Sequence, residues 1–412
     1  MEYVINKQNH EIVGIDRGET CAFLGIRYAR AKRFEKPVLE PLKDKVFATK
    51  YGDACPQWRQ FFDESKSKSK QDIFYYKEFR EGLSFTYSED CLNVNVYAPK
   101  DKTNLPVLVY IHGGAFTICS SDEKPFDGKT IAEQDVIFVT FNYRLNVFGY
   151  YSDETTSNLA FYDMKAAIEW VKQNISVFGG DPDNVTLMGQ SAGAISIQNL
   201  MLLPDVKKMV KGVIMLSGAS PSGIFSPKSK KRAIRFFNSV KRDLAKRGMD
   251  IKTASYQDVF LAWNRLTKRN LFGLAKSMLS TMPVYDGKIV RKDLYKTIFS
   301  DEQVPCIIGV TKDDLLKNYL HAQANAYLKK SKNKVWVMRF YHDLPGDSAG
   351  AYHSGDLWYI LGLWQHGWRK FDEKDEQIAK ELSARYCAFC KNHDPNVDGY
   401  PEWKEHTSYT LK

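Results

Sequence analysis

The most informative part of the sequence is Val185-Thr186-Leu187-Met188-Gly189-Gln190-Ser191-Ala192-Gly193. Its first four residues form an apolar, β-branched run that is typical of a buried strand, and a helix-like pattern follows over residues 194–202. A serine between a strand and a helix, with glycines two residues to either side, is typical of a nucleophile elbow, in which a strained turn lifts the hydroxyl above the sheet. The stretch therefore predicts acyl transfer through Ser191.

The order of the other elements also favours an α/β fold. A strand-rich entry reaches about residue 50, a charged irregular stretch follows to about residue 85, and apolar strands then alternate with helical patterns. We expect strands over residues 92–97, 107–111, 136–141, 185–188, 213–216, 304–309 and 334–340. Several are continuous apolar runs, as in strands of a parallel sheet that are buried on both faces.

The length and the spacing of these elements indicate a single α/β domain over residues 1–412. Between the fifth and sixth expected strands lies a long excursion, about residues 219–298, with helical periodicity over 233–247 and 256–268. An excursion of that length predicts a helical cap over the sheet edge.

The net charge of +10 comes partly from lysine-rich stretches at residues 65–70 and 227–232, which we expect to be solvated loops, the first of them mobile. No aromatic-interleaved basic strand or zinc-finger spacing accompanies them, so nucleic-acid binding is set aside. No run of about 18 uncharged apolar residues appears, and the first residues lack the features of a secretory signal. We expect a cytoplasmic protein without a membrane span, and the sequence leaves its oligomeric state open.

The seven cysteines, an odd number, argue against a closed disulfide framework and form no zinc-ligand set. Cys387 and Cys390 form one C-x-x-C pair within a helical pattern, where this spacing places two small apolar side chains on one face. We expect neither a metal nor an organic cofactor.

A serine nucleophile needs hydrogen-bond donors aimed at the oxyanion that forms on the attacked carbonyl. His112-Gly113-Gly114-Ala115 follows an expected strand, and glycine lets backbone N–H groups turn inward. The N–H groups of Gly113, Gly114 and Ala192 are therefore the predicted oxyanion hole. Each well-placed donor is worth roughly 10²- to 10³-fold in turnover.

In α/β-hydrolases the acid and the base follow the serine in the chain. His353 lies in the glycine-flanked loop 350–355, after the expected strand 334–340, where a base would reach the sheet edge. The competing histidines lie in helical patterns, at a strand end or in the tail: His321, His342, His366, His393 and His406.

The acid is expected in the loop that follows the buried strand 304–309. Asp313 and Asp314 both lie there, and spacing does not choose between them. The aspartate that is not used would cap the helical stretch that follows.

With these residues assembled, the chain resembles the type-B carboxylesterase family, which includes the cholinesterases and several bacterial esterases and lipases. The resemblance spans nearly the whole length. It is carried by Phe23-Leu24-Gly25-Ile26-Arg27-Tyr28-Ala29, Glu89-Asp90-Cys91-Leu92-Asn93-Val94-Asn95-Val96-Tyr97-Ala98-Pro99, Asn142-Tyr143-Arg144-Leu145, Phe178-Gly179-Gly180-Asp181-Pro182 and Pro401-Glu402-Trp403.

The resemblance implies an α/β-hydrolase fold with Ser191 as nucleophile, His353 as base and Asp314 as acid. Most members have glutamate where this chain has Asp314, so the carboxylate reaches about 1.5 Å less far and its loop must approach His353 more closely. Gln190 stands where members commonly have glutamate. Ser217 is similar to a serine that supports the triad from behind.

The family also pairs cysteines at positions like Cys55 and Cys91, which we expect to be thiols in a reducing cytoplasm. The stretch from Asp314 to His353 is much shorter than in the cholinesterases, which implies a more open pocket.

Together these features predict a serine carboxylesterase that hydrolyses small-molecule esters through an acyl-enzyme. Phe116, Ile118 and Tyr352 are the expected walls of a pocket for short to medium apolar acyl or aryl groups. The alternatives are a non-catalytic adhesion or binding member of the same fold, or a peptidase or amidase on that fold.

Overall fold

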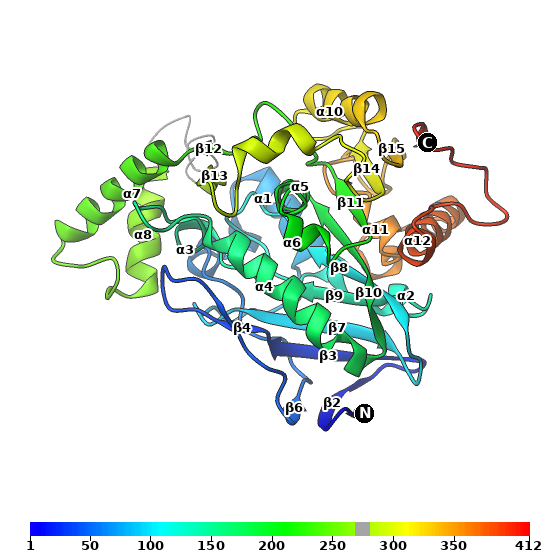
Figure 1. Ribbon diagram of the computed structural model, residues 1–412, viewed down its shortest axis with the longest axis horizontal. Helices are drawn as coiled ribbons and strands as arrows, with labels where there is room; N and C mark the ends of the chain where they lie inside the picture. Colours follow the sequence, from blue (N-terminus) through cyan, green and yellow to red (C-terminus); the bar gives the residue numbers. More distant parts are fainter. Residues whose placement is uncertain (268–280) are drawn as a thin grey trace.

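The computed structural model describes residues 1–267 and 281–412, and within them 12 strands form one large sheet (Figure 1). The strand order is β1-β2-β3-β7-β9-β8-β10-β11-β14-β15-β16, with β6 paired to β2. The strands are β1 Glu2–Lys7, β2 His10–Asp16, β3 Thr20–Arg27, β6 Lys45–Phe47, β7 Asn93–Pro99, β8 Leu105–Ile111, β9 Ile137–Phe141, β10 Gly180–Gln190, β11 Gly212–Leu216, β14 Cys306–Thr311, β15 Val335–Phe340 and β16 Ser408–Leu411.

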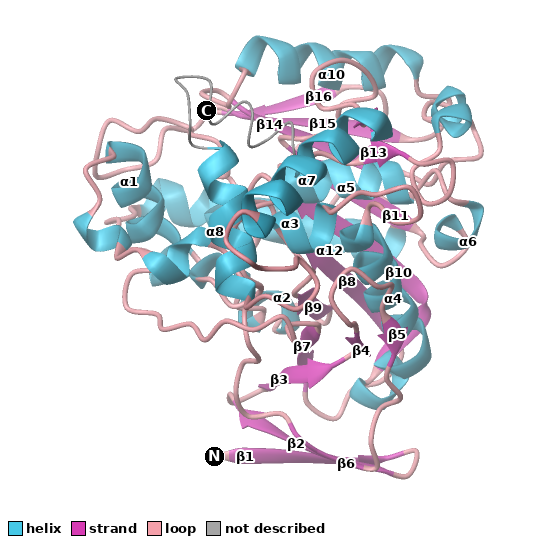
Figure 2. Ribbon diagram, turned by 90° about the vertical axis from the view of Figure 1, so that its left-hand side faces the viewer, coloured by secondary structure: helices cyan, strands magenta, loops and turns pink. Residues whose placement is uncertain are grey.

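Along the main strand order the sheet is antiparallel from β1 to β9 and parallel from β9 onward, and the side pair β2·β6 is parallel. The pairs β1·β2, β2·β3, β3·β7 and β7·β9 are antiparallel, whereas the pairs from β9·β8 to β15·β16 are parallel. Figure 2 shows β1, β2 and β6 at the edge farthest from the helix α10. In the parallel part all carboxyl ends meet at one edge, where ligands bind in open α/β sheets.

Helices cover both faces of the sheet, as Figure 1 shows. The α-helices are α1 Lys70–Phe79, α2 Lys129–Ala132, α3 Asn146–Tyr150, α4 Leu159–Asn174, α5 Ala192–Leu200, α6 Pro204–Lys207, α7 Lys230–Ala245, α8 Tyr256–Thr267, α10 Lys317–Lys330, α11 Leu357–Ile360 and α12 Glu373–Asn392.

The alternation of side chains along the strands divides the core between the two faces. On β8, Val107 and Val109 join the apolar cluster that includes α4 and α5, whereas Leu108 and Tyr110 join the cluster that includes α12. Cys387 and Cys390 are buried in the second cluster as apolar side chains. Apolar runs such as β11 are thus buried on both faces, which explains their unbroken hydrophobicity.

All seven strands expected from the sequence are confirmed, and β10 extends further toward its N-terminus than expected. The helical periodicity between β11 and β14 corresponds to α7 and α8, which lie at the left of Figure 1 and pack together through a third apolar cluster around Phe237 and Phe260. Lys268, the last residue of the second expected helix, lies outside the described residues.

The expectation of an irregular stretch before residue 85, with a loop over 65–70, is wrong. The short helices η1 (Trp58–Phe61) and η2 (Glu64–Lys66) and the helix α1 lie there. Ser69 caps α1 by accepting a hydrogen bond from the Asp72 N–H (3.3 Å).

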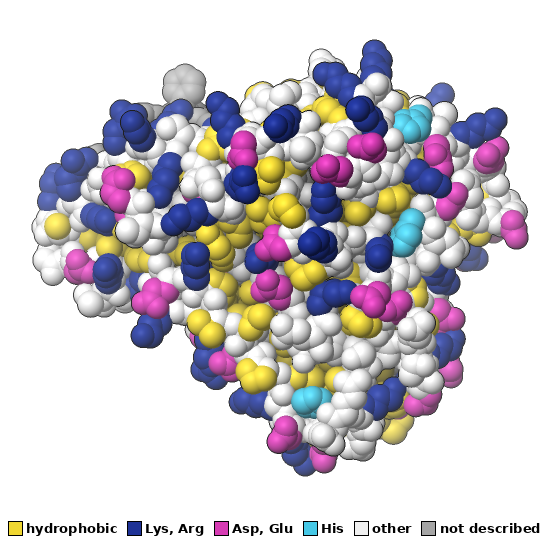
Figure 3. All heavy atoms as spheres, viewed as in Figure 1, with side chains coloured by type: hydrophobic (Ala, Val, Ile, Leu, Met, Phe, Trp, Pro, Cys, Tyr) yellow, Lys and Arg dark blue, Asp and Glu magenta, His cyan; other side chains and the backbone are white. Residues whose placement is uncertain are grey.

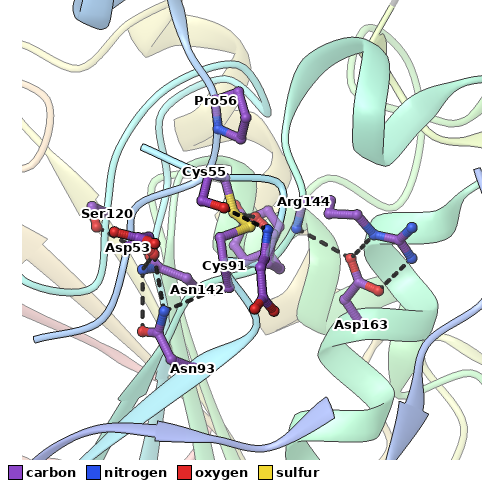
Figure 4. Close-up of a disulfide and its surroundings, with 12 residues drawn as sticks. Asp53, Cys55, Pro56, Cys91, Asn93, Ser120, Asn142, Arg144 and Asp163 are labelled. Atoms are coloured by element: carbon purple, nitrogen blue, oxygen red, sulfur yellow. Dashed lines mark hydrogen bonds and ion pairs between the residues drawn. A yellow bond between two sulfur atoms is a disulfide. The ribbon is translucent and has the colours of Figure 1, made fainter. Parts of the chain in front are cut away.

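A disulfide joins Cys55 and Cys91, with their Cα atoms 5.2 Å apart (Figure 4). The expectation that both are thiols is therefore wrong. Beside the bond, side-chain amides tie the flanking loops together: Asn93 Nδ2 donates to the Asp53 carbonyl (2.9 Å), and Asn142 Nδ2 donates to the side chain of Asn93 (3.4 Å). Because such bonds persist in oxidising compartments, these cysteines give no support to the expected cytoplasmic location.

On the face that Figure 3 shows, lysine and arginine side chains are scattered among acidic ones. Within the described ranges, no helix is both long and apolar enough to cross a membrane.

Candidate active site

Ser191 lies between β10 and α5 in a strained conformation, with φ 56° and ψ −119°. Its N–H donates to the Leu216 carbonyl of the neighbouring strand (2.8 Å), which holds the turn against the sheet. A Cβ atom on Gly193 would lie only 1.9 Å from the Ile111 carbonyl oxygen, so this close approach requires glycine. The predicted elbow is present, with a partly exposed serine at its tip.

Asp314 and His353 meet at the carboxyl ends of β14 and β15. Nδ1 of His353 lies 2.5 Å from Oδ1 of Asp314, and both side chains are buried. The other carboxylate oxygen accepts hydrogen bonds from Ser217 Oγ (2.6 Å) and from the Thr311 N–H (3.2 Å). The carboxylate therefore fixes the imidazole with its proton on Nδ1 and leaves Nε2 as an acceptor.

The neighbouring Asp313 is exposed and holds the backbone of the histidine loop instead. Its carboxylate accepts from the Ala351 N–H (3.1 Å), and its own N–H donates to the Ala351 carbonyl (3.0 Å). This bridge draws the loop that carries Asp314 against the loop that carries His353. The two loops are thus close enough for the shorter aspartate side chain to contact the imidazole.

Gln190 contacts Nε2 of His353, the ring nitrogen that Asp314 leaves unpaired. Its Nε2 lies 3.0 Å from Nε2 of His353, so the amide N–H donates to the imidazole. Within the described residues, Ser191 Oγ makes no hydrogen bond to His353. Gln190 therefore contacts the imidazole nitrogen that would accept the serine proton. Hydrogen bonds between a nucleophile and its base often tighten only in the substrate complex.

The loop after β8 lies close to the serine, and Gly113 and Gly114 line the same cavity as Ser191. A Cβ atom on Gly113 would lie 3.1 Å from Ser191 Cβ, a spacing that glycine allows. His112 braces this loop: its ring stacks on Tyr143 with centroids 4.4 Å apart, and its Nδ1 contacts the Gly113 carbonyl (3.0 Å). Burial lowers the pKa of His112 to about 4, so this imidazole is neutral and donates from Nδ1.

A cavity of about 310 Å³ opens over these groups. Ser191, His353, Gly113, Gly114 and Ala192 line it, as do the expected wall residues Phe116 and Ile118. Further apolar wall residues are Tyr75, Phe79, Ile195, Phe225, Met282, Leu315 and Leu320. The expectation that Tyr352 is a wall residue is wrong, because Tyr352 is not among the described residues that line the cavity.

One side of the cavity is charged, which the sequence did not indicate. Arg59 forms ion pairs with Glu123 (Nη1 to Oε1, 2.7 Å) and Glu64 (Nε to Oε1, 3.0 Å), and Arg80 lies 2.9 Å from the second oxygen of Glu64. All four side chains are buried. Most of these charged residues lie in the disulfide-closed segment, residues 55–91. In the sequence, Ser69 followed by Asp72 was the available signal that a helix begins in this segment.

Another buried carboxyl group, Asp356, follows His353 by three residues. Among the described residues, neither of its oxygens has a hydrogen-bond partner. Burial, and then the negative charge of Asp314, raise the pKa of Asp356 to about 7. This carboxyl group therefore changes charge near neutral pH.

A mostly parallel sheet with a strained serine between strand and helix, and with an acid and a histidine in later loops, defines the α/β-hydrolase class. Residues 5–329 match the family model described as "Carboxylesterase family". The chain belongs to this family and is a carboxylic ester hydrolase.

Relatives of known activity cover almost the whole chain. It is 28% identical to the para-nitrobenzyl esterase of Bacillus subtilis (strain 168), over 99% of this chain and 94% of that protein. It is 38% identical to carboxylesterase 5A of Felis catus, over 93% of this chain and 84% of the relative. A solved structure of a PNB esterase superposes with a TM-score of 0.81 at 26% identity, over 99% of this chain and 95% of that one.

Proposed function

We propose that the protein cleaves carboxylic esters by a serine mechanism with an acyl-enzyme intermediate. The observation that carries the proposal is the His353–Asp314 hydrogen bond at the elbow serine, in a cavity that Gly113 and Ala192 also line. The reaction requires a base with a free nitrogen, a carboxylate that orients it and donors for the oxyanion.

In the first half-reaction Ser191 Oγ attacks the ester carbonyl while His353 Nε2 takes its proton. Gln190 must release Nε2 for this transfer. The N–H groups of Gly113, Gly114 and Ala192 stabilise the oxyanion. The tetrahedral intermediate then collapses, and His353 gives its proton to the leaving alcohol.

In the second half-reaction His353 removes a proton from water, which attacks the acyl-enzyme. Collapse of the second intermediate returns the proton to Ser191 and releases the carboxylic acid. Asp314 orients the imidazole and stabilises the imidazolium, while Ser217 Oγ donates to the carboxylate and holds it in place. The steps use side chains, backbone N–H groups and water, without a metal or organic cofactor.

The size and lining of the cavity favour short to medium apolar acyl or aryl esters. Its volume of about 310 Å³ is at the lower end of the range for small-molecule sites. Phe116 and Ile118 supply apolar contacts beside the serine. The name of the bacterial relative, a para-nitrobenzyl esterase, agrees with an aryl group on the alcohol side.

The test compares Ser191→Ala with Ser196→Ala. Ser196 lies on α5, is buried, and donates to the Ala192 carbonyl (2.9 Å), so its replacement perturbs the same helix without touching the cavity. With para-nitrophenyl acetate and butyrate, Ser191→Ala should abolish turnover at an unchanged melting temperature, and Ser196→Ala should keep it. Turnover retained by Ser191→Ala would refute the proposed mechanism.

A further inference from the structure

Glu78, in the last turn of α1, is a buried carboxylate at the centre of a polar cluster outside the cavity lining. One oxygen accepts from Tyr352 Oη (2.6 Å) and Trp358 Nε1 (3.1 Å). The other accepts from Trp368 Nε1 (2.7 Å) and Arg369 Nε (3.0 Å). The surroundings supply a full set of donors, which is what a carboxylate at this depth requires.

Two of these donors flank the catalytic histidine in the chain. Tyr352 directly precedes His353, and Trp358 follows it by five residues. Packing reinforces the contact, because the ring of Tyr352 meets the ring of Phe74 from α1 edge-on with centroids 4.7 Å apart. The short run that carries His353 is therefore attached to α1 on both sides of the imidazole.

The opposite side of the same run is attached to the sheet. Asp313, after β14, forms a backbone β-bridge with Tyr352, and its carboxylate accepts a hydrogen bond from the Ala351 N–H (3.1 Å). His353 is held between these two attachments, and its own side chain is fixed by Asp314 (2.5 Å). Without Glu78, the hydrogen bonds to Tyr352 and Trp358 would be lost. The run would then keep its contacts with Phe74 and with Tyr75 Oη, which donates to the His353 carbonyl (3.5 Å), on the α1 side.

We propose that Glu78 is a positioning residue for His353. It touches neither the substrate nor the reacting atoms and acts through Tyr352 and Trp358, which keep the loop where His353 Nε2 can serve both Ser191 and the leaving group. The inference rests on the proposed role of His353 as the base. A misplacement of about 1 Å in a reacting group can cost roughly 100-fold in rate, so a change at Glu78 affects catalysis although Glu78 itself does not line the cavity.

The attachment also explains what the disulfide-closed segment contributes to the reaction. Glu78 lies within the segment that Cys55 and Cys91 close, so the bond limits how far α1 can move away from the histidine loop. The segment thus holds the catalytic loop in addition to forming a cavity wall.

The test variant is Glu78→Gln, which keeps the side-chain shape but places an amide N–H₂ among hydrogen-bond donors. We expect kcat to fall by about tenfold to a hundredfold, with KM within about twofold of wild type, because Glu78 acts on the position of the base and does not itself line the cavity. Labelling of Ser191 by a fluorophosphonate should slow by the same factor.

The matched control is Glu381→Gln on α12. Glu381 also pairs with a buried arginine and a tyrosine hydroxyl, Arg385 Nε (2.8 Å) and Tyr409 Oη (2.6 Å), but these partners do not contact the histidine loop. We expect this variant to lose thermal stability to a similar extent and to keep kcat. A loss of kcat no larger than in Glu381→Gln, or a loss entirely in KM, would overturn the positioning role.

Tyr352→Phe removes only the hydroxyl that reaches Glu78, and it tests the inference if Glu78→Gln does not fold. We expect a smaller loss of kcat and labelling rate at unchanged KM, and full activity would overturn the inference. In the Glu78→Gln/Tyr352→Phe variant the two losses of kcat should be less than additive.

Wild-type protein that does not label at Ser191 would overturn the proposed function together with this inference. A labelled wild type with an unaffected Glu78→Gln would overturn the positioning role alone.

Discussion

Opening the disulfide should destabilise the fold by an amount that follows from its position in the chain. The bonded cysteines, Cys55 and Cys91, are 36 residues apart. In the chain-entropy model, closing a loop of this size removes about 13 cal/mol/K from the unfolded ensemble, or about 4 kcal/mol at 25 °C. A chain of 412 residues unfolds with an entropy of about 0.9 kcal/mol/K, so the melting temperature should fall by about 4 °C.

Differential scanning calorimetry of wild-type protein with and without a phosphine reductant measures this shift. A Cys55→Ala/Cys91→Ala variant should melt near the reduced wild type and be insensitive to reductant. The matched control is Cys387→Ala/Cys390→Ala, which removes two buried free thiols and should keep the full response to reductant. A shift of less than about 1 °C in the wild-type melting temperature on reduction would contradict this expectation, because the disulfide would then stabilise the fold far less than loop closure predicts.

Three further changes test individual groups of the site. Asp314→Asn should lower kcat for para-nitrophenyl butyrate by about 10⁴-fold and Asp313→Asn by only a few-fold, because the first orients the base and the second a backbone; the opposite ranking would move the acid by one residue. The pKa of Asp356 is raised to about 7 in the folded protein, so between about pH 4 and 7 the folded protein keeps a proton that the unfolded chain has lost. The free energy of unfolding should therefore decrease as pH rises through this range, by up to about 4 kcal/mol. Urea denaturation at pH 5 and pH 8 should show a larger decrease for wild type than for Asp356→Asn, and equal decreases would show that this carboxyl group is not the cause. Gln190→Glu places a carboxylate beside Nε2 of His353 and should move the acid limb of the kcat/KM profile to higher pH; an unmoved limb would mean that residue 190 does not face the imidazole in the working enzyme.

The sheet could be predicted from sequence because its signals are local. Strands such as β11 are continuous apolar runs, and a glycine of the elbow is required by the close contact of Gly193 with the Ile111 carbonyl. The chain order of serine, acid and base then narrowed the candidates to a few loops. Backbone geometry fixes these features, so they leave a clear trace in the sequence.

The choice between adjacent residues and the contacts across the site could not be predicted in the same way. Asp313 and Asp314 have the same chemistry, and only the path of their loop turns one toward Ala351 and the other toward His353. The contact of Gln190 with His353, and that of Tyr352 with Glu78 instead of the cavity, join segments more than 160 residues apart. Spacing along the chain carries no information on such pairs.

The segment between the bonded cysteines was misjudged for a different reason. Its lysine-rich composition suggested a solvated loop, but Glu64, Glu78 and Arg80 are buried in ion pairs and hydrogen bonds that composition alone does not reveal. Charged residues are rarely buried unless they are paired, and the partners come from elsewhere in the chain.

Mass spectrometry of intact protein and of peptides, after incubation with a fluorophosphonate, reports whether Ser191 is activated by His353 and Asp314. Activation by these residues predicts one adduct per chain, on Ser191, with labelling strongly slowed in Asp314→Asn and absent in Ser191→Ala. Folded protein that gains no adduct, or that is labelled on another residue, would contradict it.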